Sequence, residues 1–254
     1  MSNFNSDLLD EINFLRSNPR RYSKKILKYI EYFKDNVLYI PGSNAGIPTE
    51  EGPVAFKEAA DALIKEERRN ILEPSKGLCK LAENFLSEAQ KDADNVGNIQ
   101  PDVLIKKLGL GTLHGYVSRL FEFGGETPEQ VIINIIVSDG DPSRSQRESL
   151  LNAGVKQIGV ANGKHDMYGH LTTIIVATKF KSNDNSDDKG LLDGEYIPKD
   201  LEKVNDNEVD EDVERIEKIE NIITEKGIKK KITKIIKYMK DGTKQIETYK
   251  EKAE

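Results

Sequence analysis

The chain contains three histidines, so a histidine-based mechanism has few candidate residues. His165 and His170 flank a short turn and, with Asp166, could form a metal site at the surface. A metal ion needs at least three converging ligands, and these are usually held by further hydrogen bonds. We therefore expect structural or solvent-exposed roles for this group. His114 lies in a glycine-rich stretch, and we expect no catalytic role for it.

Other chemical motifs are weak or missing. Gly109-Leu110-Gly111 lacks both the spacing and the preceding strand of a dinucleotide-binding loop, and the sequence has no phosphate-binding loop or Gly-x-Ser-x-Gly nucleophile turn. The acidic run at 183–188 lacks the glycine and the closing glutamate of a calcium loop, so it indicates a solvated linker. Cys79 lies beside Leu78 in an apolar helical pattern, where a cysteine acts as a small buried hydrophobe.

The first third of the chain is predicted to be largely helical. Ser6 can cap a helix whose apolar residues recur every three or four positions, at Leu8, Ile12 and Leu15. Pro19 ends this helix and suits the first turn of the next one. Residues 36–53 contain prolines and glycines and are expected to form a loop, and residues 54–69 predict a third helix.

The middle of the chain combines clear helix starts with one irregular stretch. Ser75 precedes an amphipathic helix, and Thr127-Pro128-Glu129 is typical of a helix start. Residues 95–126 are glycine-rich and are expected to be irregular, apart from a short helix near 103–108. The β-branched runs at 157–161 and 172–178 flank a turn and predict an antiparallel hairpin.

Composition changes sharply after Phe180. Residues 184–220 hold 15 acidic and 5 basic side chains, too polar to bury a core, so a linker is expected. Residues 228–254 hold nine lysines and four acids, and Asp241-Gly242 is typical of a tight hairpin turn. A further strand is predicted near 219–226. We expect three parts: a folded domain at 1–181, an acidic linker at 182–220 and a basic hairpin tail at 221–254, which needs another surface to lie on.

The bulk composition favours an intracellular protein. A net charge of −6 argues against nucleic acid as a partner. A lone cysteine allows no internal disulfide, and Met1 to Asp10 lacks the pattern of a signal peptide. We find no Asn-x-Ser/Thr acceptor and no apolar run of the roughly 20 residues needed for a transmembrane segment. Together these features predict a cytoplasmic location.

Several segments in the order found here resemble the CAP (cysteine-rich secretory/antigen 5/pathogenesis-related) family, in its cysteine-poor intracellular form. The resemblance covers roughly residues 8–180. It implies an α/β fold: an α/β/α sandwich with a small antiparallel sheet, which agrees with the four or five helices and the late hairpin that the sequence pattern predicts. The segments that carry it are Leu9-x-x-Ile12-Asn13-x-x-Arg16-x-x-Pro19, Glu51-Gly52, the helix after Ser75, Asp139-Gly140-x-Pro142-Ser143-Arg144, and Ile158-Gly159-Val160-Ala161 through His165.

The same resemblance implies a cavity in which two histidines and two acidic residues can hold a divalent cation such as zinc. The first histidine maps near Gly97-Asn98 and the second onto Gln146. The first acid maps near Ser118-Arg119, with Glu122 close by, and the second onto Ser138-Asp139. Most of these positions lack a metal-binding side chain, and Arg119 would repel a cation. We therefore expect no metal, no cofactor and no catalytic residue.

These observations predict a non-catalytic binding or structural protein. We expect the lysine-rich tail to meet an acidic protein surface, such as tubulin in a ciliary or other cytoskeletal assembly. One alternative is a lipid- or membrane-surface-binding module, and the chain's own acidic linker could also pair with the tail. The other alternative is a residual metal-dependent hydrolase that uses Glu122, Asp139 and His114.

Overall fold

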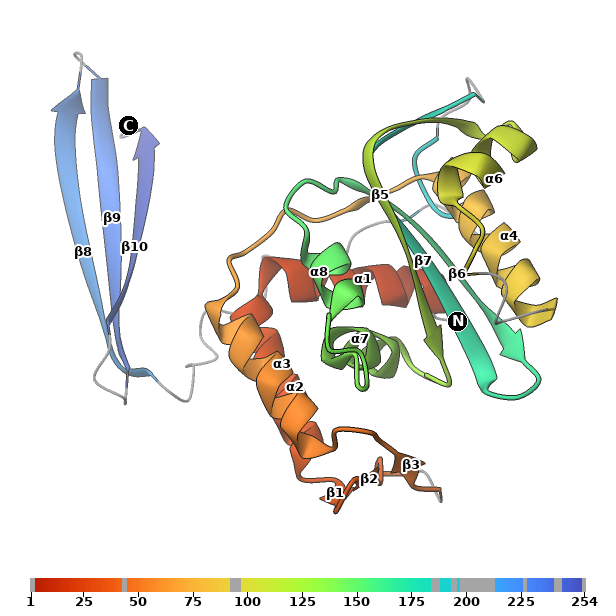
Figure 1. The fold of residues 1–254 in the computed structure, drawn as a ribbon. Helices are drawn as coiled ribbons and strands as arrows, with labels where there is room; N and C mark the ends of the chain where they lie inside the picture. Colours follow the sequence, from red (N-terminus) through yellow and green to blue (C-terminus); the bar gives the residue numbers. More distant parts are fainter. Residues whose placement is uncertain are drawn as a thin grey trace. The chain divides into compact units, whose positions relative to one another are not determined.

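The computed structural model describes residues 3–42, 45–91, 97–183, 188–192, 196, 213–225, 228–239 and 244–252. Within these residues it contains seven helices rather than the four or five expected, together with a four-stranded sheet and two three-stranded sheets (Figure 1). The chain divides into two compact units, Met1–Lys199 and Asp200–Glu254. None of the described helices is long and apolar enough to cross a membrane.

The first three helices are α1 (Phe4–Ser17), α2 (Pro19–Ile30) and α3 (Pro53–Lys65). The prediction that Ser6 caps α1 is wrong: Asn3 is the N-cap, and its side chain accepts a hydrogen bond from the Asn5 amide (3.0 Å). The predicted role of Pro19 at the first turn of α2 is confirmed. Between α2 and α3, β1 (Phe33–Lys34), β2 (Val37–Leu38) and β3 (Ile47–Pro48) form a small antiparallel sheet, of which β2 and β3 lie within the expected loop.

The main sheet has the strand order β4-β6-β7-β5. The predicted hairpin is confirmed and is longer than expected, with β6 (Gln157–His165) paired antiparallel to β7 (Gly169–Ser182). β5 (Gly111–Phe123) is antiparallel to β7, whereas the short β4 (Glu73–Pro74) is parallel to β6. The sheet is therefore mixed.

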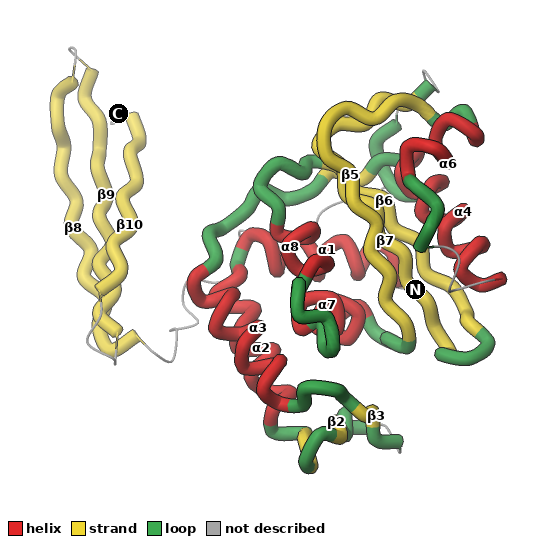
Figure 2. The backbone as a smooth tube through the Cα atoms, in the orientation of Figure 1, coloured by secondary structure: helices red, strands yellow, loops and turns green. Residues whose placement is uncertain are grey.

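Helices cover both faces of this sheet (Figure 2). α4 (Lys76–Lys91) and α6 (Pro101–Leu108) pack on one face, where the sheet supplies residues such as Ile175 and Ala177. The other face supplies Ile174 and Val176 to a larger core. Consecutive strand residues point to opposite faces, which explains why β7 is apolar almost continuously here. The predicted α/β fold with a helical layer on each side is confirmed.

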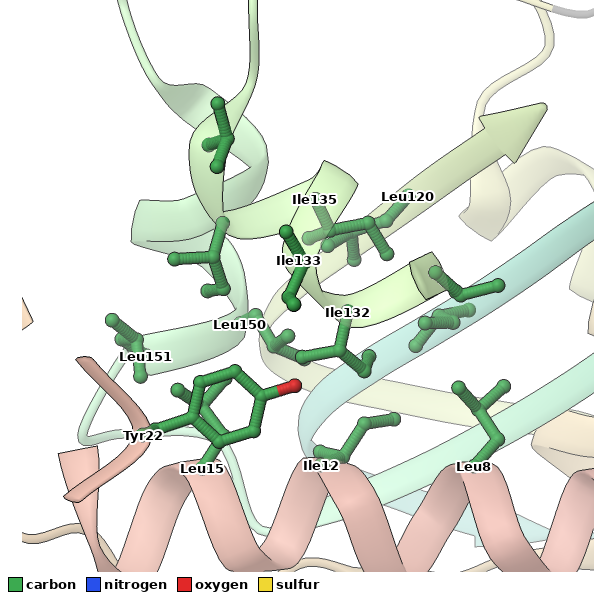
Figure 3. Packing of buried hydrophobic residues seen from close by; sticks show 14 of the residues in the cluster. Leu8, Ile12, Leu15, Tyr22, Leu120, Ile132, Ile133, Ile135, Leu150 and Leu151 are labelled. Carbon is green, nitrogen blue, oxygen red and sulfur yellow. The ribbon is translucent and has the colours of Figure 1, made fainter. Parts of the chain in front are cut away.

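The larger core lies between the sheet and the helices on this face, and Figure 3 shows part of it. α1 contributes Leu8, Ile12 and Leu15, which are fully buried at the predicted helical spacing. α7 (Pro128–Val137) and α8 (Ser145–Leu151) close the core from the other side with residues such as Ile132 and Leu150. The start of α7 was predicted correctly, since Thr127 and Gln130 form a reciprocal capping box.

The prediction that residues 95–126 are irregular is wrong. Residues 101–108 form α6, and β5 then runs for 13 residues along β7, with a break in register between His114 and Val117. Gly109, Gly111 and Gly115 have positive φ values, so glycine is needed there to end the helix and shape the irregular start of the strand. The glycines that suggested a loop are positions where the chain turns into an edge strand.

The first unit extends beyond the residue-181 boundary expected from composition. Asp188 accepts hydrogen bonds from the Ser75 hydroxyl (2.6 Å) and the Gly77 amide (2.9 Å) at the start of α4. Leu191 is buried in the larger core, and the Tyr196 hydroxyl donates to Asp10 (2.8 Å). Part of the acidic segment thus belongs to the folded unit, while residues 197–212 lie outside the described residues.

The second unit contains a three-stranded antiparallel sheet of order β10-β9-β8. Its strands are β8 (Val213–Glu225), β9 (Ile228–Met239) and β10 (Lys244–Lys252). The predicted pairing of the two tail strands is confirmed, and the third strand begins six residues earlier than expected. The predicted Asp241-Gly242 turn lies outside the described residues.

Candidate functional site

Arg119 occupies the region where the family resemblance implies the first histidine and first acid. Its guanidinium donates hydrogen bonds to the carbonyls of Ile99 (2.5 Å) and Gly97 (3.2 Å). The same group stacks on the rings of Phe85 and Phe121, with its central carbon 4.6 and 4.9 Å from their centroids. Burial lowers the pKa of Arg119. The positively charged Arg119 side chain therefore joins the 97–99 segment to β5.

Gln146 and Ser118 tie α8 to β5. The Gln146 side-chain oxygen accepts a hydrogen bond from the backbone amide of Phe121 (3.0 Å). The Ser118 hydroxyl donates to Ser149 on α8 (3.0 Å), and the Tyr116 and Ser149 hydroxyls lie 2.9 Å apart. Because Ser118 and Arg119 are consecutive strand residues, they face opposite sides of the sheet. The implied ligand positions are therefore divided between the two sides of β5.

Glu122 is the buried carboxyl of this strand, with 5% of its surface exposed. It accepts hydrogen bonds from the Asn134 side chain (2.8 Å) and from the Gly125 amide (3.1 Å). Burial raises the pKa of Glu122, and the hydrogen bonds from Asn134 and Gly125, together with the charge of His170, oppose this rise. The carboxyl is held inside the joint between β5 and α7.

The structure does not bring His114 and Glu122 together. His114 pairs with Lys179 on β7, whereas Glu122 pairs with Thr172. At about 3.3 Å per residue, seven strand positions correspond to roughly 23 Å. A general acid and base must both reach the reacting atoms at hydrogen-bond distance. These two residues cannot act on one substrate group.

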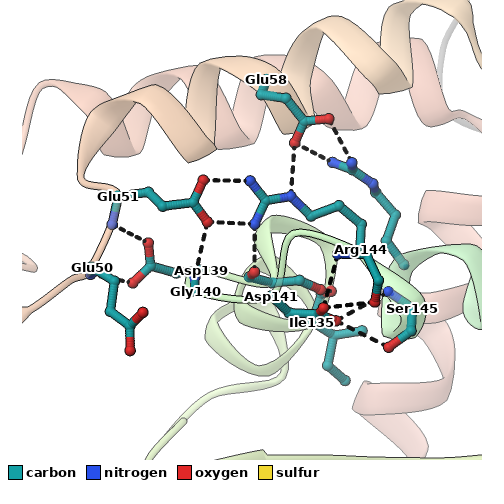
Figure 4. A network of polar contacts seen from close by, with 12 residues as sticks. Glu50, Glu51, Glu58, Ile135, Asp139, Gly140, Asp141, Arg144 and Ser145 are labelled. Atoms are coloured by element: carbon teal, nitrogen blue, oxygen red, sulfur yellow. Dashed lines mark hydrogen bonds and ion pairs between the residues drawn. The ribbon is translucent and has the colours of Figure 1, made fainter.

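Asp139, the position of the second acid, connects the α7–α8 turn to the segment before α3 (Figure 4). Its two carboxylate oxygens accept hydrogen bonds from the amides of Glu50 (2.7 Å) and Glu51 (2.9 Å). In return, the Glu51 carboxylate accepts from the Gly140 amide (2.9 Å). Two of the segments on which the family resemblance rests are thus joined, because a carboxylate of each accepts hydrogen bonds from backbone amides of the other.

Arg144 is the centre of this joint. Its guanidinium binds both carboxylate oxygens of Glu51 (2.6 and 2.7 Å) and the Ser138 carbonyl (2.6 Å). Its Nε lies 3.3 Å from Glu58 on α3, whose carboxylate also pairs with Arg147 (2.6 and 3.0 Å). The pKa of Glu51 is lowered chiefly by the hydrogen bond from Arg144. We call Glu51, Glu58, Asp139, Arg144 and Arg147 the polar joint.

The backbone of the polar joint explains its sequence pattern. Ser138, Gly140 and Arg144 all have positive φ values, between 49° and 76°. Asp141 accepts hydrogen bonds from the amides and hydroxyls of Ser143 and Ser145, chiefly the Ser143 hydroxyl, which lowers the pKa of Asp141 to about 2. The Asp-Gly-x-Pro-Ser-Arg segment therefore encodes a tight turn that aims Arg144 at α3.

Of the remaining predicted candidates, His165 and Cys79 have local structural roles, whereas the buried Nδ1 of His170 has no hydrogen-bond partner within the described residues. His165 Nδ1 accepts hydrogen bonds from the amides of Met167 (3.2 Å) and Tyr168 (3.3 Å), and its ring packs on Phe123 and Tyr168. Cys79 is buried in α4, as predicted. Within the part of the chain that the structure describes, no three His, Cys, Asp or Glu side chains are grouped so that they could hold a metal ion.

The register of the second sheet distributes charge unequally between its faces. Alternate residues of a strand share a face, and directly paired residues share it too. We define the lysine-rich face as the positions aligned with Ile236, and the mixed face as those aligned with Ile235. The lysine-rich face contains six basic and two acidic positions: Arg215, Lys230, Lys234, Lys244, Lys250 and Lys252, against Glu217 and Glu225.

The mixed face is nearly balanced. It contains four basic positions, Lys218, Lys229, Lys231 and Lys237, and three acidic ones, Glu220, Glu247 and Glu251. The sequence alone predicted a basic hairpin without distinguishing these faces. The assignment requires the pairing register, because a one-residue slip exchanges every position between faces.

Comparison with known proteins gives few matches. No family model matches the chain, and no curated protein matches it. Among solved structures, an outer surface protein from Borrelia burgdorferi aligns with 50% of this chain and 91% of its own at 20% sequence identity. The TM-score of that alignment is 0.36, a similarity too distant to identify a shared fold.

Proposed function

We propose that this chain is a non-catalytic binding or structural protein that attaches to an acidic protein surface through its second sheet. The lysine-rich face of that sheet is the observation that carries the proposal. Six basic positions against two acidic ones, on a chain whose net charge is −6, concentrate positive charge in one place. Complementary charge across an interface speeds association and selects the partner.

The composition of the lysine-rich face suits protein docking. Its basic positions alternate with apolar ones, which are Ile219, Ile223, Ile228, Ile232, Ile236, Tyr238 and Ile246. A purely charged face would bind weakly and lose its partner in salt, whereas isoleucines among lysines add apolar area to a bound complex. A three-stranded sheet of this composition is also stabilised when one face is covered.

In this proposal the first unit is a CAP-like scaffold inside the cell. Its polar joint and buried Glu122 are committed to internal contacts, which supports a structural role for the positions that the family resemblance marks. The partner is a protein with a dense acidic surface. Tubulin, in a ciliary or other cytoskeletal assembly, is the partner class we propose to test first.

The test compares two full-length variants with the same change in charge. Lys230, Lys234 and Lys250 lie on the lysine-rich face, and Lys229, Lys231 and Lys237 lie on the mixed face. Each set is replaced by glutamine, and co-sedimentation with microtubules is measured with and without their acidic tails. Loss of binding in the first variant alone, together with dependence on the tails, is the expected result.

Two outcomes would contradict the proposal. Equal loss in both variants would mean that total charge matters and the face does not. If the unmodified chain binds neither microtubules nor polyglutamate, an acidic protein partner is ruled out. A parallel sedimentation with vesicles containing an anionic lipid tests the membrane alternative, which is favoured if the vesicles bind and the polypeptides do not.

A further inference from the structure

A small pocket opens between the end of α3 and α8, on a part of the first unit to which the proposed function assigns no role. Its volume is about 280 Å³, close to the lower limit for small-molecule sites. Five polar residues line it: Glu66, Arg69, Arg147, Glu148 and Asn152. Alanine and leucine side chains complete the walls. Such a pocket suits a small, charged molecule.

Arg16 is fully buried and bonds to the backbone of Asn152, one of the residues that line this pocket. Its guanidinium donates to the carbonyls of Asn70 (3.0 Å), Leu150 (2.5 Å) and Asn152 (3.3 Å), which joins the segment after α3 to the end of α8. The pKa of Arg16 is lowered to about 10 by burial and by the nearby charge of Arg69. Within the described residues no carboxylate forms an ion pair with Arg16, although the charge of Glu66 acts on it and raises its pKa against the larger lowering effects.

Two guanidinium N–H groups at this place lack a hydrogen-bond partner within the described residues. They are Nη2 of Arg16 and Nε of Arg69, and both atoms are buried. The terminal nitrogens of Arg69 pair with Glu66 and Glu67, and these ion pairs hold its guanidinium group in place. Buried donors without acceptors destabilise a fold, and an anion that accepts from such groups gains a charge-assisted hydrogen bond. The chemistry therefore favours a carboxylate or another anion beside Arg69.

The carboxylates of the pocket select among anions. Glu66 and Glu148 line the same walls, and Glu148 is exposed. A dianion such as phosphate would meet these two like charges, whereas a protonated amine would be attracted to them. We propose that the pocket binds a free α-amino acid, with its carboxylate at Arg69 and its ammonium group at Glu148.

The first experiment titrates the isotope-labelled full-length chain and follows its backbone amide signals. Single L-amino acids are compared with acetate, methylamine and inorganic phosphate, which carry one half of the proposed ligand or the wrong charge. We expect at least one amino acid to shift the signals of Asn152 and Ala153, and to bind about tenfold more tightly than acetate or methylamine. If no amino acid binds, or if acetate or phosphate binds as tightly, the proposal is wrong.

The second experiment uses matched variants. Arg69→Gln removes a pocket guanidinium, and Arg68→Gln makes the same change at an exposed neighbour that does not line the pocket. We expect about a tenfold loss of amino acid affinity for Arg69→Gln and none for Arg68→Gln. Glu148→Gln changes an exposed side chain and should also weaken binding without altering the unfolding midpoint. Unchanged affinity in either pocket variant would overturn the proposal.

Discussion

The two larger sheets of this molecule differ in how they bury their faces. In the first unit, helices cover both sides, and β7 presents apolar residues to each of them. In the second unit, isoleucine and lysine positions alternate on the lysine-rich face of β9, and each face of the sheet contains charged positions. A sheet between two helical layers is held by packing, whereas a sheet with lysines on a face gains from an oppositely charged partner. The same secondary structure thus serves stability in one unit and, in the proposed function, recognition in the other.

The largest effect is expected where α4 lies directly on the first sheet. At Gly159 on β6, a Cβ atom would lie 2.1 Å from the backbone carbon of Leu78. Backbone atoms cannot move aside as a side chain can, so Gly159→Ala should lower the free energy of unfolding by about 3 kcal/mol or more. Urea unfolding followed by circular dichroism measures this change.

Gly163→Ala is the matched control on the same strand. Its Cβ would approach only the Leu86 and Gln90 side chains, at 3.0 and 3.2 Å, and these can rotate. We expect a loss below about 1 kcal/mol. Similar losses at both positions would show that contact with the α4 backbone is not what distinguishes them.

The second effect concerns the polar joint. Arg144→Ala removes the bidentate contact with Glu51, the bond to the Ser138 carbonyl and the approach to Glu58. Because the glutamates regain water, we expect a loss of about 2 kcal/mol rather than the sum of the separate bonds. Thermal unfolding of the variant tests this, with Arg68→Ala as an exposed control.

A glycine variant separates the effect of backbone conformation at Arg144 from the effect of losing its charge. Arg144 has a φ of 50°, which glycine adopts without strain. Both variants lack the ion pairs of Arg144, so they differ only in backbone preference. Arg144→Gly should therefore be at least as stable as Arg144→Ala. A clearly less stable glycine variant would contradict the backbone assignment of the turn.

A smaller, pH-dependent effect is expected at Glu122. Burial raises the pKa of this carboxyl in the folded state. As pH rises above the ordinary pKa of a glutamic acid, the unfolded chain loses this proton first, so stability falls until the raised pKa is passed. Glu122→Gln does not titrate, so its stability relative to the unmodified chain should increase with pH across that interval and then stay level. Urea unfolding from pH 4 to 8 measures the difference, and a constant difference would contradict the prediction.

The smallest effect is expected from removing the second unit. The described core of the first unit consists of residues up to Leu191 and Tyr196. Deleting residues 200–254 should therefore leave the unfolding midpoint of the first unit unchanged. A large shift would mean that the second sheet contributes to the stability of the first unit, and the contrast between the two sheets would no longer hold.

Sequence reasoning succeeded where the signal was local. Pro19, Ser75 and Thr127 mark helix starts through contacts within a few residues, and their predicted positions are confirmed. It failed at β5, where the glycines at 109–115 suggested a loop. Phe121, Glu122 and Phe123 alternate as expected for a strand, but the strand is stabilised by pairing with β7, whose paired residues lie 48 to 71 positions away.

The candidate site shows the same division. The sequence drew attention to Asp139 and Arg144 through the family resemblance, which implied a metal-ligand position at Ser138-Asp139 and not the polar joint. Their partners, Glu51 and Glu58, lie roughly 90 positions away, so no local pattern could reveal the polar joint. The stacking of Arg119 on Phe85 and the unequal faces of the second sheet were equally hidden.

By itself, the amino-acid sequence determined the starts of α2, α4 and α7, the apolar stripes and the change from an acidic to a basic tail. These features follow from backbone preferences and from the periodicity of side chains over a few residues. Only the tertiary structure decided which charged side chains form ion pairs and which charged positions share a face of a sheet. Ion pairing and strand register depend on residues that are distant in the chain, and only folding brings those residues within reach of one another.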